Sequence, residues 1–215
     1  MKFKVQDISD CTLAFNFSNS IDEKTNQYIN LLFESLIGSD LDLLSIYPTY
    51  NSLIATYNPI KTQKKDIVYF IKNLTVSTDK KNHETDQLYL EIPVKYGGEN
   101  GPDLGSISRI LSLSEDQIIE IHSSTIYYVF MIGFSPGFPY LGGLDSRLEC
   151  PRLSTPRVEV QAGSVAIADK QTGIYPSKSS GGWRIIGNTS LKLFDKKLEN
   201  PSLIKPGMKI KFTPL

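Results

Sequence analysis

An α+β fold in two domains is predicted, with a small split βαβ domain over residues 1–96 and a closed or nearly closed β structure over residues 97–215. Strand and helix periodicities alternate through the first domain. A turn-rich stretch at 96–103 marks the seam between the domains. Beyond residue 127, short apolar stretches are broken every few residues by glycine or proline, which is typical of closed β structures.

Each element of the first domain follows from its apolar spacing. Strands are predicted where apolar residues alternate with polar ones or form short runs, and helices where apolar residues recur at helical spacing. Gly38 is placed to end the first helix, and residues 80–84 form a polar loop. The order is strand, helix, strand, strand, helix, strand, over residues 13–17, 21–36, 44–47, 53–57, 61–74 and 88–94.

The second domain begins with two helices. Asp103 is placed to cap the first of them. Ser114 and Gln117 form a capping box for the second, which ends near His122. The helices span 104–111 and 114–122, and the strands predicted after them span 127–132, 158–160, 165–168, 183–186, 191–194 and 209–212.

Composition narrows the function classes. The 215 residues carry 23 Lys+Arg and 23 Asp+Glu, a formal net charge of +0, which argues against a nucleic-acid binder because such proteins usually carry a basic excess. No apolar run approaches the ~20 residues of a membrane span, and we expect no secretory signal. Two cysteines, Cys11 and Cys150, are too few for a disulfide scaffold. We therefore expect a soluble cytoplasmic protein with both thiols reduced.

Common catalytic motifs are missing. The sequence has no phosphate-binding P-loop and no Gly-x-Gly-x-x-Gly fingerprint after a strand, and no closely spaced set of zinc ligands. The histidines are His83, in a charged loop, and His122, just before a buried strand. His122 is a candidate general base or proton relay. The alternative is a buried structural histidine near a helix C-terminus.

The stretch 133–144 is rich in glycine, proline and aromatic residues. Glycine and proline fix a backbone path that ordinary residues cannot follow, so Phe138 and Tyr140 make rigid walls for a ligand or peptide groove. The alternative is a tightly turned barrel corner whose aromatic side chains fill the core.

Two arginines follow next to prolines. Arg152 and Arg157 are candidates to present a guanidinium to a carboxylate or phosphate. The alternative for at least one of them is an ion pair with Asp145, Glu149 or Glu159.

A third rigid element joins polar and aromatic residues. Gln171 can read the edge of an amide or carboxylate, and Tyr175 stands beside a proline. Gly181 and Gly182 expose backbone amides to a close ligand, next to Trp183. The alternative is a β-turn with a core tryptophan. No metal site is predicted.

These stretches together resemble one family, that of the B subunit of bacterial 5-oxoprolinase (PxpB), the KipI-type inhibitor of a histidine kinase, and allophanate hydrolase subunit 1, with part of urea carboxylase. Each motif is weak alone, but the ordered set covers well over half the chain. The motifs are Glu91-Ile92-Pro93-Val94, Tyr96-Gly97-Gly98, Gly101-Pro102-Asp103-Leu104, His122, Gly133-Phe134, Pro136-Gly137-Phe138, Tyr140-Leu141, Pro151-Arg152, Thr155-Pro156-Arg157, Ala162-Gly163-Ser164-Val165, Ile167-Ala168, Gln171-Thr172-Gly173-Ile174-Tyr175-Pro176, Gly181-Gly182-Trp183, Ile186-Gly187 and Leu193-Phe194.

The resemblance implies a small α+β N-terminal domain, a cyclophilin-like β-barrel C-terminal domain and a partner of the KipA type, which is the C subunit in the oxoprolinase. There, a large A subunit completes a complex that opens 5-oxoproline to glutamate with ATP, so ATP is used by the complex and no cofactor is expected on this chain. The family usually has Cys at Lys95, Pro at Gln161 and Pro at Ser180. Loss of the last proline loosens that loop.

Two function classes remain. The first is an enzyme subunit, in which Phe138, Tyr140, Arg157, Gln171, Tyr175, Gly181, Gly182 and Trp183 help to hold a small amide or carboxylate substrate and His122 has a catalytic role. Within this class, allophanate hydrolase is an alternative to 5-oxoprolinase. The second is a regulatory protein that docks on a histidine kinase and blocks its autophosphorylation, for which the aromatic and proline residues of 134–140 are the motivation.

Overall fold

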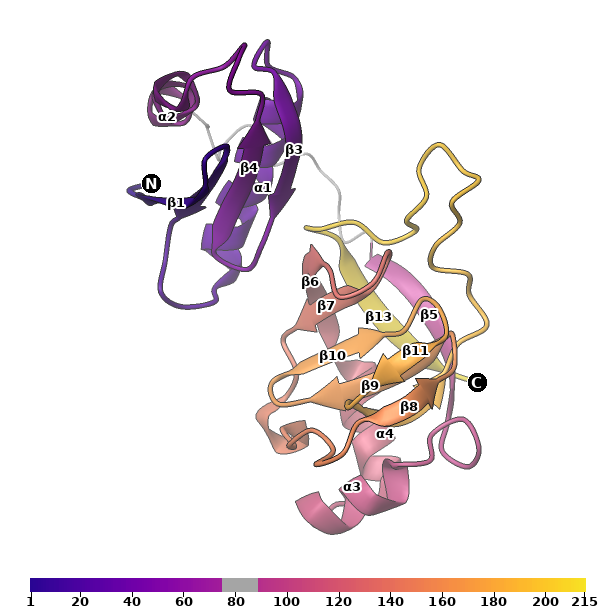
Figure 1. Cartoon of the computed structure of the whole chain (residues 1–215). Helices are drawn as coiled ribbons and strands as arrows, with labels where there is room; N and C mark the ends of the chain where they lie inside the picture. The colour runs from indigo at the N-terminus through magenta and orange to yellow at the C-terminus, as the bar shows by residue number, and fades with distance from the viewer. Residues whose placement is uncertain (75–88) are drawn as a thin grey trace. The chain divides into compact units, whose positions relative to one another are not determined.

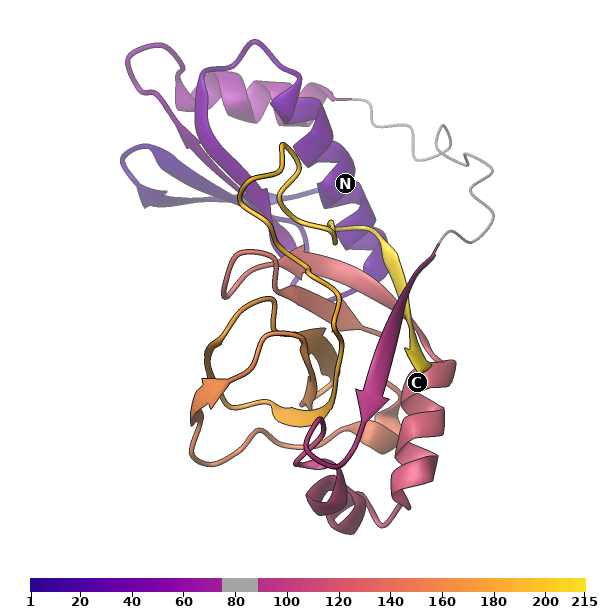
Figure 2. The same ribbon diagram turned by 90° about the vertical axis from the view of Figure 1, so that its right-hand side faces the viewer.

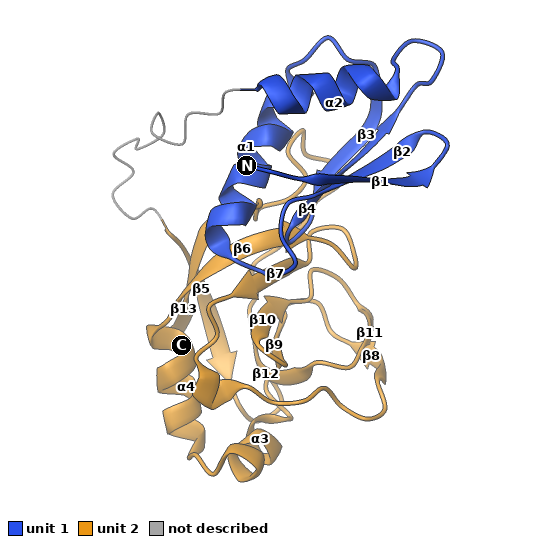
Figure 3. Ribbon diagram, turned by 90° about the vertical axis from the view of Figure 1, so that its left-hand side faces the viewer, with its two compact units in different colours: residues 1–86 blue, residues 87–215 orange. Residues whose placement is uncertain are grey.

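The computed structural model describes residues 1–74 and 89–215. The chain divides into two compact units, Met1–Asp86 and Gln87–Leu215 (Figure 3), and each has its own hydrophobic core. The polar loop predicted at 80–84, with His83, lies outside the described residues. Across the described part of the chain, no helix combines the length and the apolar character that crossing a membrane requires.

The first unit is an antiparallel sheet with two helices (Figure 1). Its strands lie in the order β1-β2-β4-β3. The elements are β1 (Lys4–Ser9), β2 (Thr12–Asn16), α1 (Glu23–Ile37), β3 (Leu43–Pro48), β4 (Ser52–Tyr57) and α2 (Lys64–Asn73).

Helix α1 provides much of the core of this unit. Asp22 caps the helix, because its Oδ1 accepts a hydrogen bond from the backbone N–H of Thr25 at 2.8 Å. Ile29 and Leu32 are fully buried and belong to the same core as Phe15 of β2. The helix therefore forms where the apolar spacing predicts it, two residues later than expected.

Two features of the first unit differ from the prediction. Strand β1 was not expected, because only Val5 in it is even partly buried and the segment carries almost no apolar alternation. The strand predicted at 88–94 exists as β5 (Tyr89–Tyr96), but it pairs with β12 and β13 in the second unit. The last strand of the predicted split βαβ order therefore belongs to the second unit, and the chain divides after residue 86 instead of after residue 96. Alternation identifies a strand but says nothing about which sheet it joins.

Seven strands close the barrel of the second unit, in the order β10-β7-β6-β13-β5-β12-β9. Strand β13 is parallel to β5 and antiparallel to β6, and Figure 2 shows it in yellow beside the magenta β5. Strands β8 and β11 form a separate two-stranded sheet. The remaining strands are β6 (Ile126–Ile132), β7 (Pro139–Gly142), β8 (Arg157–Val160), β9 (Ser164–Ala168), β10 (Gln171–Ile174), β11 (Ser179–Gly181), β12 (Arg184–Asn188) and β13 (Lys209–Pro214).

Helices α3 (Leu104–Leu111) and α4 (Glu115–Ser124) precede the closing strands. The predicted capping box of α4 is confirmed: the N–H of Gln117 donates to Ser114 Oγ at 3.1 Å, and the N–H of Ser114 donates to Gln117 Oε1 at 2.8 Å. Asp103 precedes α3, but its side chain makes no capping hydrogen bond. That carboxylate is used elsewhere.

Strand β9 buries side chains on both of its faces. Val165 and Ile167 point into the barrel core, whereas Ala166 and Ala168 belong to a second cluster. Successive side chains of a strand alternate between the two faces of the sheet, so this second cluster lies on the outer face. The wall formed by β9, β10 and β7 thus separates two apolar layers.

Three other predictions for the second unit need adjustment. Residues 191–194 do not form a strand, and Phe194 makes a single bridge to Ser202. Leu193 is nevertheless buried in the barrel core, which accounts for the apolar signal. Strands β10 and β7 lie in stretches that were interpreted as rigid loops, because their glycine and proline content masked the strand pattern.

Candidate functional site

The aromatic residues predicted to form a site come together on the outer face of the barrel. We call Phe138, Tyr140, Tyr175 and Trp183 the outer aromatic cluster. The ring of Phe138 lies 5.0 Å from Tyr140, 5.2 Å from Tyr175 and 5.4 Å from Trp183, between centroids, in edge-to-face geometry. Such pairs are favourable beyond simple burial, so the four rings form a rigid surface.

Strand β11 closes over this cluster at Gly181. A Cβ added to Gly181 would lie 2.3 Å from the Tyr175 hydroxyl oxygen, so only glycine leaves room for this ring. Gly181 also pairs in register with Arg157 of β8. The Tyr175 hydroxyl and Arg157 are thereby brought to the same short stretch of backbone.

The site residues differ in how far a ligand can reach them. Phe138, Tyr175 and Trp183 are buried, so the predicted alternative of core-filling aromatics holds for these three side chains. Tyr140, Arg157, Gln171, Gly181 and Gly182 are half-buried. The accessible part of the site is therefore polar, with the aromatic cluster beneath it.

Phe134 forms an exposed rim. The residue is 61% exposed, and its ring centroid lies 5.4 Å from that of Phe138 and 6.1 Å from that of Tyr175. Its backbone φ is +61°, which is uncommon for a residue with a large side chain. The tight turn that follows, in which the N–H of Phe138 donates to the carbonyl of Ser135 at 3.0 Å, holds this ring outward.

Both arginines form ion pairs, but not with the acids proposed from the sequence. Arg157 donates to Asp103 across 2.6 Å, and Arg152 donates through Nε to Asp169 at 3.0 Å. Arg152 also lies over the ring of Trp183, with its guanidinium carbon 5.9 Å from the centroid. Asp145 instead pairs with Arg147. Neither true partner is near its arginine in sequence, so spacing could not identify it.

Gln171 opens strand β10 and is paired in register with Ala168. Its neighbour Thr172 points into the barrel, because the Thr172 hydroxyl meets His122. By alternation Gln171 therefore faces outward, on the side of Ala168 and the outer aromatic cluster. The structure thus brings Gln171 to the same face as the other predicted binding residues.

The two tyrosine hydroxyls of the cluster remain neutral donors near neutral pH. Burial raises the pKa of Tyr140, and the nearby Arg152 guanidinium partly opposes this. Burial also raises the pKa of Tyr175, against smaller lowering effects that include a hydrogen bond with the Trp183 backbone and the charges of Arg152 and Arg157. The outer face therefore offers O–H donors and cations to a ligand that carries acceptor oxygens.

His122 lies in the barrel interior, apart from this face. It is fully buried, and its ring stacks on Phe212 at 4.5 Å between centroids. The Thr172 hydroxyl donates to the Ala166 carbonyl at 3.0 Å, so it accepts from His122 Nε2 at 2.9 Å. The network then assigns His122 Nδ1 as the acceptor from the Tyr96 hydroxyl, at 2.8 Å.

Both ring nitrogens of His122 are thus occupied within the core, and burial lowers its pKa to about 3. This geometry fits the structural alternative for His122 better than a catalytic one. Among the described residues, no group of three or more His, Cys, Asp and Glu side chains is arranged to hold a metal ion.

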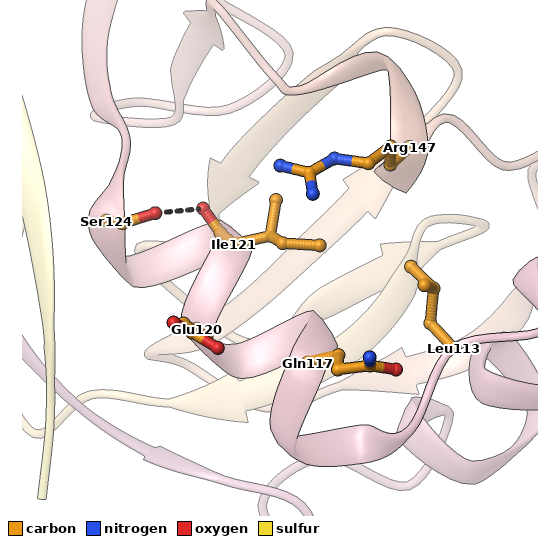
Figure 4. A pocket seen from close by; sticks show the side chains of 6 residues that line it. All are labelled: Leu113, Gln117, Glu120, Ile121, Ser124 and Arg147. Carbon is orange, nitrogen blue, oxygen red and sulfur yellow. Dashed lines mark hydrogen bonds between the residues drawn. The ribbon is translucent and has the colours of Figure 1, made fainter.

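A separate cleft of about 230 Å³ lies between α4 and the short 3-10 helix η2 (Ser146–Leu148) (Figure 4). It is lined by Leu113, Gln117, Glu120, Ile121, Ser124 and Arg147. Arg147 reaches over Ile121 in this view, and two of its nitrogens are already committed to Asp145. No residue predicted from the sequence as part of a binding site lines this cleft.

The two units and the arginine-flanked aromatic face define an α+β protein with a closed barrel domain. The chain belongs to the family described as carboxyltransferase domain, subdomain C and D, whose model matches residues 3–204. The predicted α+β class with a barrel domain is confirmed, as is the resemblance to the B subunit of 5-oxoprolinase.

Individual relatives agree with this assignment. The 5-oxoprolinase B subunit of Bacillus subtilis (strain 168) is 33% identical over 99% of this chain and 92% of its own length. The protein of the same name in Escherichia coli O157:H7 is 50% identical over 61% of this chain and 60% of its own length. The crystal structure of TTHA0988 matches with a TM-score of 0.84 and 31% identity, covering 95% of this chain and 40% of that chain. This chain thus corresponds to less than half of the TTHA0988 polypeptide.

Sequence reasoning missed two residues of this face. Asp103 was interpreted as a helix cap, and Asp169 was not considered as a partner of Arg152. Phe134 was included in the 134–140 stretch that motivated the kinase-binding alternative. Asp103 and Arg157 are 54 positions apart. The one available signal was that Asp103 falls in a Gly-Pro-Asp turn, which fixes a backbone more tightly than a helix cap needs.

Proposed function

We propose that this chain is the B subunit of an ATP-dependent 5-oxoprolinase, which opens 5-oxoproline to glutamate. The observation that carries the proposal is the 33% identity with the 5-oxoprolinase B subunit of Bacillus subtilis along almost the whole of both chains. Fold alone would not support a function, because one fold serves many activities. The polar residues around the outer aromatic cluster add a site of suitable chemistry.

The proposal includes partner proteins. The names of the relatives describe one part of a multi-subunit assembly, and we propose a KipA-type partner (the C subunit) and a large A subunit for this chain. The ATP is then held elsewhere in the complex, since no P-loop motif occurs in the sequence. The complex is proposed to act in the cytoplasm.

The outer aromatic cluster is the proposed substrate face. 5-Oxoproline is a small ring with an amide and a carboxylate, so it offers acceptor oxygens at two positions and one N–H donor. Arg157 and the tyrosine hydroxyls supply donors, and Gln171 supplies both a donor and an acceptor. Gly181 and Gly182 let a small ring approach the backbone.

Removing Arg157 or Gln171 should lower the activity of the complex. We expect Arg157→Ala and Gln171→Ala each to reduce kcat/KM for 5-oxoproline by roughly tenfold or more. Arg157→Ala would lose a charge-assisted hydrogen bond to the substrate, and Gln171→Ala would lose a hydrogen bond that is partly shielded from water. The measurement is ATP-dependent glutamate release by the reconstituted complex. Matched controls are Arg147→Ala, in the separate cleft, and Gln161→Ala on an exposed site. Unchanged turnover in both site variants would remove these residues from the substrate face.

A second function, inhibition of a histidine kinase, is favoured by one observation. Phe134 is held outward and is 61% exposed, and a rigid exposed aromatic ring is a typical anchor in a protein interface. If this function holds, excess protein should suppress autophosphorylation of the purified kinase, and Phe134→Ala should weaken the inhibition by roughly tenfold or more. A matched control is Tyr69→Ala, which removes an exposed aromatic ring in the first unit. A kinase that ignores excess wild-type protein excludes this second function for that kinase.

A further inference from the structure

Asp103 lies at the border of the outer aromatic cluster and has no place in the proposed function so far. Asp103 is only 6% exposed. Its backbone N–H donates to the Ile185 carbonyl at 3.0 Å, and its Oδ2 accepts from the Ile185 N–H at 2.6 Å. Ile185 is itself a member of the buried cluster that contains Trp183. Asp103 is therefore fixed against β12, and its second oxygen is left to point away from that strand.

That second oxygen, Oδ1, holds Arg157. The Nη2 of Arg157 donates to it at 2.6 Å. The other terminal nitrogen, Nη1, is shielded from solvent and has no hydrogen-bond partner. Burying an N–H without an acceptor is unfavourable, and more so when the group is charged. One half of the guanidinium is thus anchored, and the other half lacks an acceptor.

The anchored guanidinium stands beside the aromatic cluster. Arg157 pairs in register with Gly181, and the Tyr175 hydroxyl fills the space where a side chain at Gly181 would lie. Burial raises the pKa of Tyr175, and the charge of Arg157 is among the smaller effects that oppose this rise. The unpartnered Nη1 therefore belongs to the face that carries Tyr175 and Trp183.

Strands β8 and β11, which carry Arg157 and Gly181, form a small separate sheet. Strands β8 and β11 span four and three residues, belong to no larger sheet, and change register between Ser179 and Gly181. A two-stranded ribbon of this length is marginally stable by itself. This ribbon can therefore shift more readily than the barrel strands, while the contact with Asp103 ties the Arg157 guanidinium to β12.

We propose that Asp103 is a positioning residue that aims Arg157 Nη1 at the carboxylate of the substrate. The ligand class is a small ring bearing a carboxylate, so this inference rests on the proposed function and assigns the substrate's acid group to one named atom. Arg157 recognises the carboxylate, and Asp103 acts through Arg157 without touching the substrate. A lysine could not do both, because a planar guanidinium offers two separate nitrogens whereas an ammonium is a single point of charge.

A purely structural role for the pair predicts something different. If Asp103 only fastened the 97–103 turn to β12, losing it would affect every ligand and every step alike. A positioning role predicts a loss confined to ligands that carry a carboxylate. The contrast between 5-oxoproline and 2-pyrrolidone, the same lactam ring without the acid group, separates the two roles.

The test uses Asp103→Asn in the reconstituted complex. The asparagine oxygen can still accept from Ile185 N–H, but it brings no charge to Arg157. We expect KM for 5-oxoproline to rise roughly tenfold to a hundredfold with kcat within about twofold, the size of one charge-assisted hydrogen bond. Competitive inhibition by 2-pyrrolidone should stay within about twofold. The matched control is Glu159→Gln, on the same strand as Arg157. It breaks an exposed ion pair with Lys178 and should change neither KM for 5-oxoproline nor the inhibition constant of 2-pyrrolidone.

Arg157→Lys gives an independent variant in case Asp103→Asn does not fold. Its single ammonium should stay with Asp103, so KM for 5-oxoproline should rise as in Asp103→Asn, again without loss of 2-pyrrolidone binding. Equal losses for both compounds, or no change in KM in either variant, overturn the positioning role.

The single tryptophan of the chain makes the carboxylate site testable without turnover. Trp183 lies in the cluster, so 5-oxoproline should change its fluorescence in the full chain at concentrations where 2-pyrrolidone gives a weaker response, and Arg157→Lys should abolish that difference. A wild-type complex that does not turn over 5-oxoproline counts against the proposed function. Absent or equal fluorescence responses to the two compounds count against the carboxylate site.

Discussion

Acid should destabilise the barrel unit through His122: we expect its free energy of unfolding to fall by up to about 1.4 kcal/mol per pH unit below pH 6.5 because of this residue. Burial lowers the pKa of His122 in the folded protein to about 3, from the ordinary histidine value of 6.5. Below 6.5 the unfolded chain binds the proton and the folded one does not, so unfolding is favoured progressively until the folded pKa is reached. The contribution is fully present above pH 6.5.

The measurement is urea unfolding followed by Trp183 fluorescence, which reports the second unit, at several pH values between 4 and 8. His122→Gln provides the comparison, because it removes this titration and leaves every carboxylate in place. The variant should be less stable than wild type near pH 7.5 by roughly 1–3 kcal/mol, since it leaves polar groups of the core unsatisfied. Its loss of stability toward acid should be distinctly shallower. Parallel pH profiles for the two proteins would falsify the assignment of this sensitivity to His122.

The features that the sequence predicted well are those with a local cause. The apolar period of α1 and the Ser114–Gln117 capping box depend on residues within a few positions of each other, and both are confirmed. Strand β9 was predicted because its apolar run is short and bounded by turn residues. Such patterns depend on interactions between residues that are close in sequence, so they can be recognised without knowing which other elements pack against them.

What could not be predicted depends on long-range pairing. Strand β5 was predicted as a strand, but its neighbour β13 is more than one hundred residues later in the chain. The alternation of apolar residues in β5 does not indicate which strand it pairs with. The ion pair between Arg157 and Asp103 could not be predicted for the same reason, because the two residues are 54 positions apart. A nearby acid such as Glu159 was considered as a partner for an arginine, but Glu159 forms its ion pair with Lys178.

The aromatic face was predicted in composition but not in accessibility. Phe138 was expected as a wall of a ligand groove and Trp183 as a binding residue, and the two do gather on one face. Their burial follows from the outer layer being closed by Gly181 and β11, which a sequence pattern does not reveal. The half-buried part of the face consists of Tyr140, Arg157, Gln171, Gly181 and Gly182.

Gly163→Ala is expected to be among the most damaging single substitutions in the barrel unit. Gly163 has φ +81°, and a Cβ built there would lie 2.0 Å from the Thr189 carbonyl oxygen. Its own N–H donates to the Tyr175 carbonyl at 2.7 Å, and its carbonyl accepts from the Thr189 N–H at 2.9 Å. The clash is with backbone that is fixed by these same hydrogen bonds, so relief requires breaking them.

We expect a loss of about 3–5 kcal/mol for this variant, combining the cost of a left-handed non-glycine residue with the displacement of packed backbone. Gly98→Ala is the matched control, because Gly98 also has a positive φ, +53°, but nothing lies within 4 Å of its added Cβ. It should cost only about 1–2 kcal/mol. Urea unfolding monitored by Trp183 fluorescence compares the two variants. Because Gly163 also holds the backbone of Tyr175, its variant should lose the proposed 5-oxoproline response of Trp183, whereas Gly98→Ala should retain it. Equal destabilisation by the two substitutions would mean that φ alone, rather than the contact with Thr189, makes Gly163 necessary.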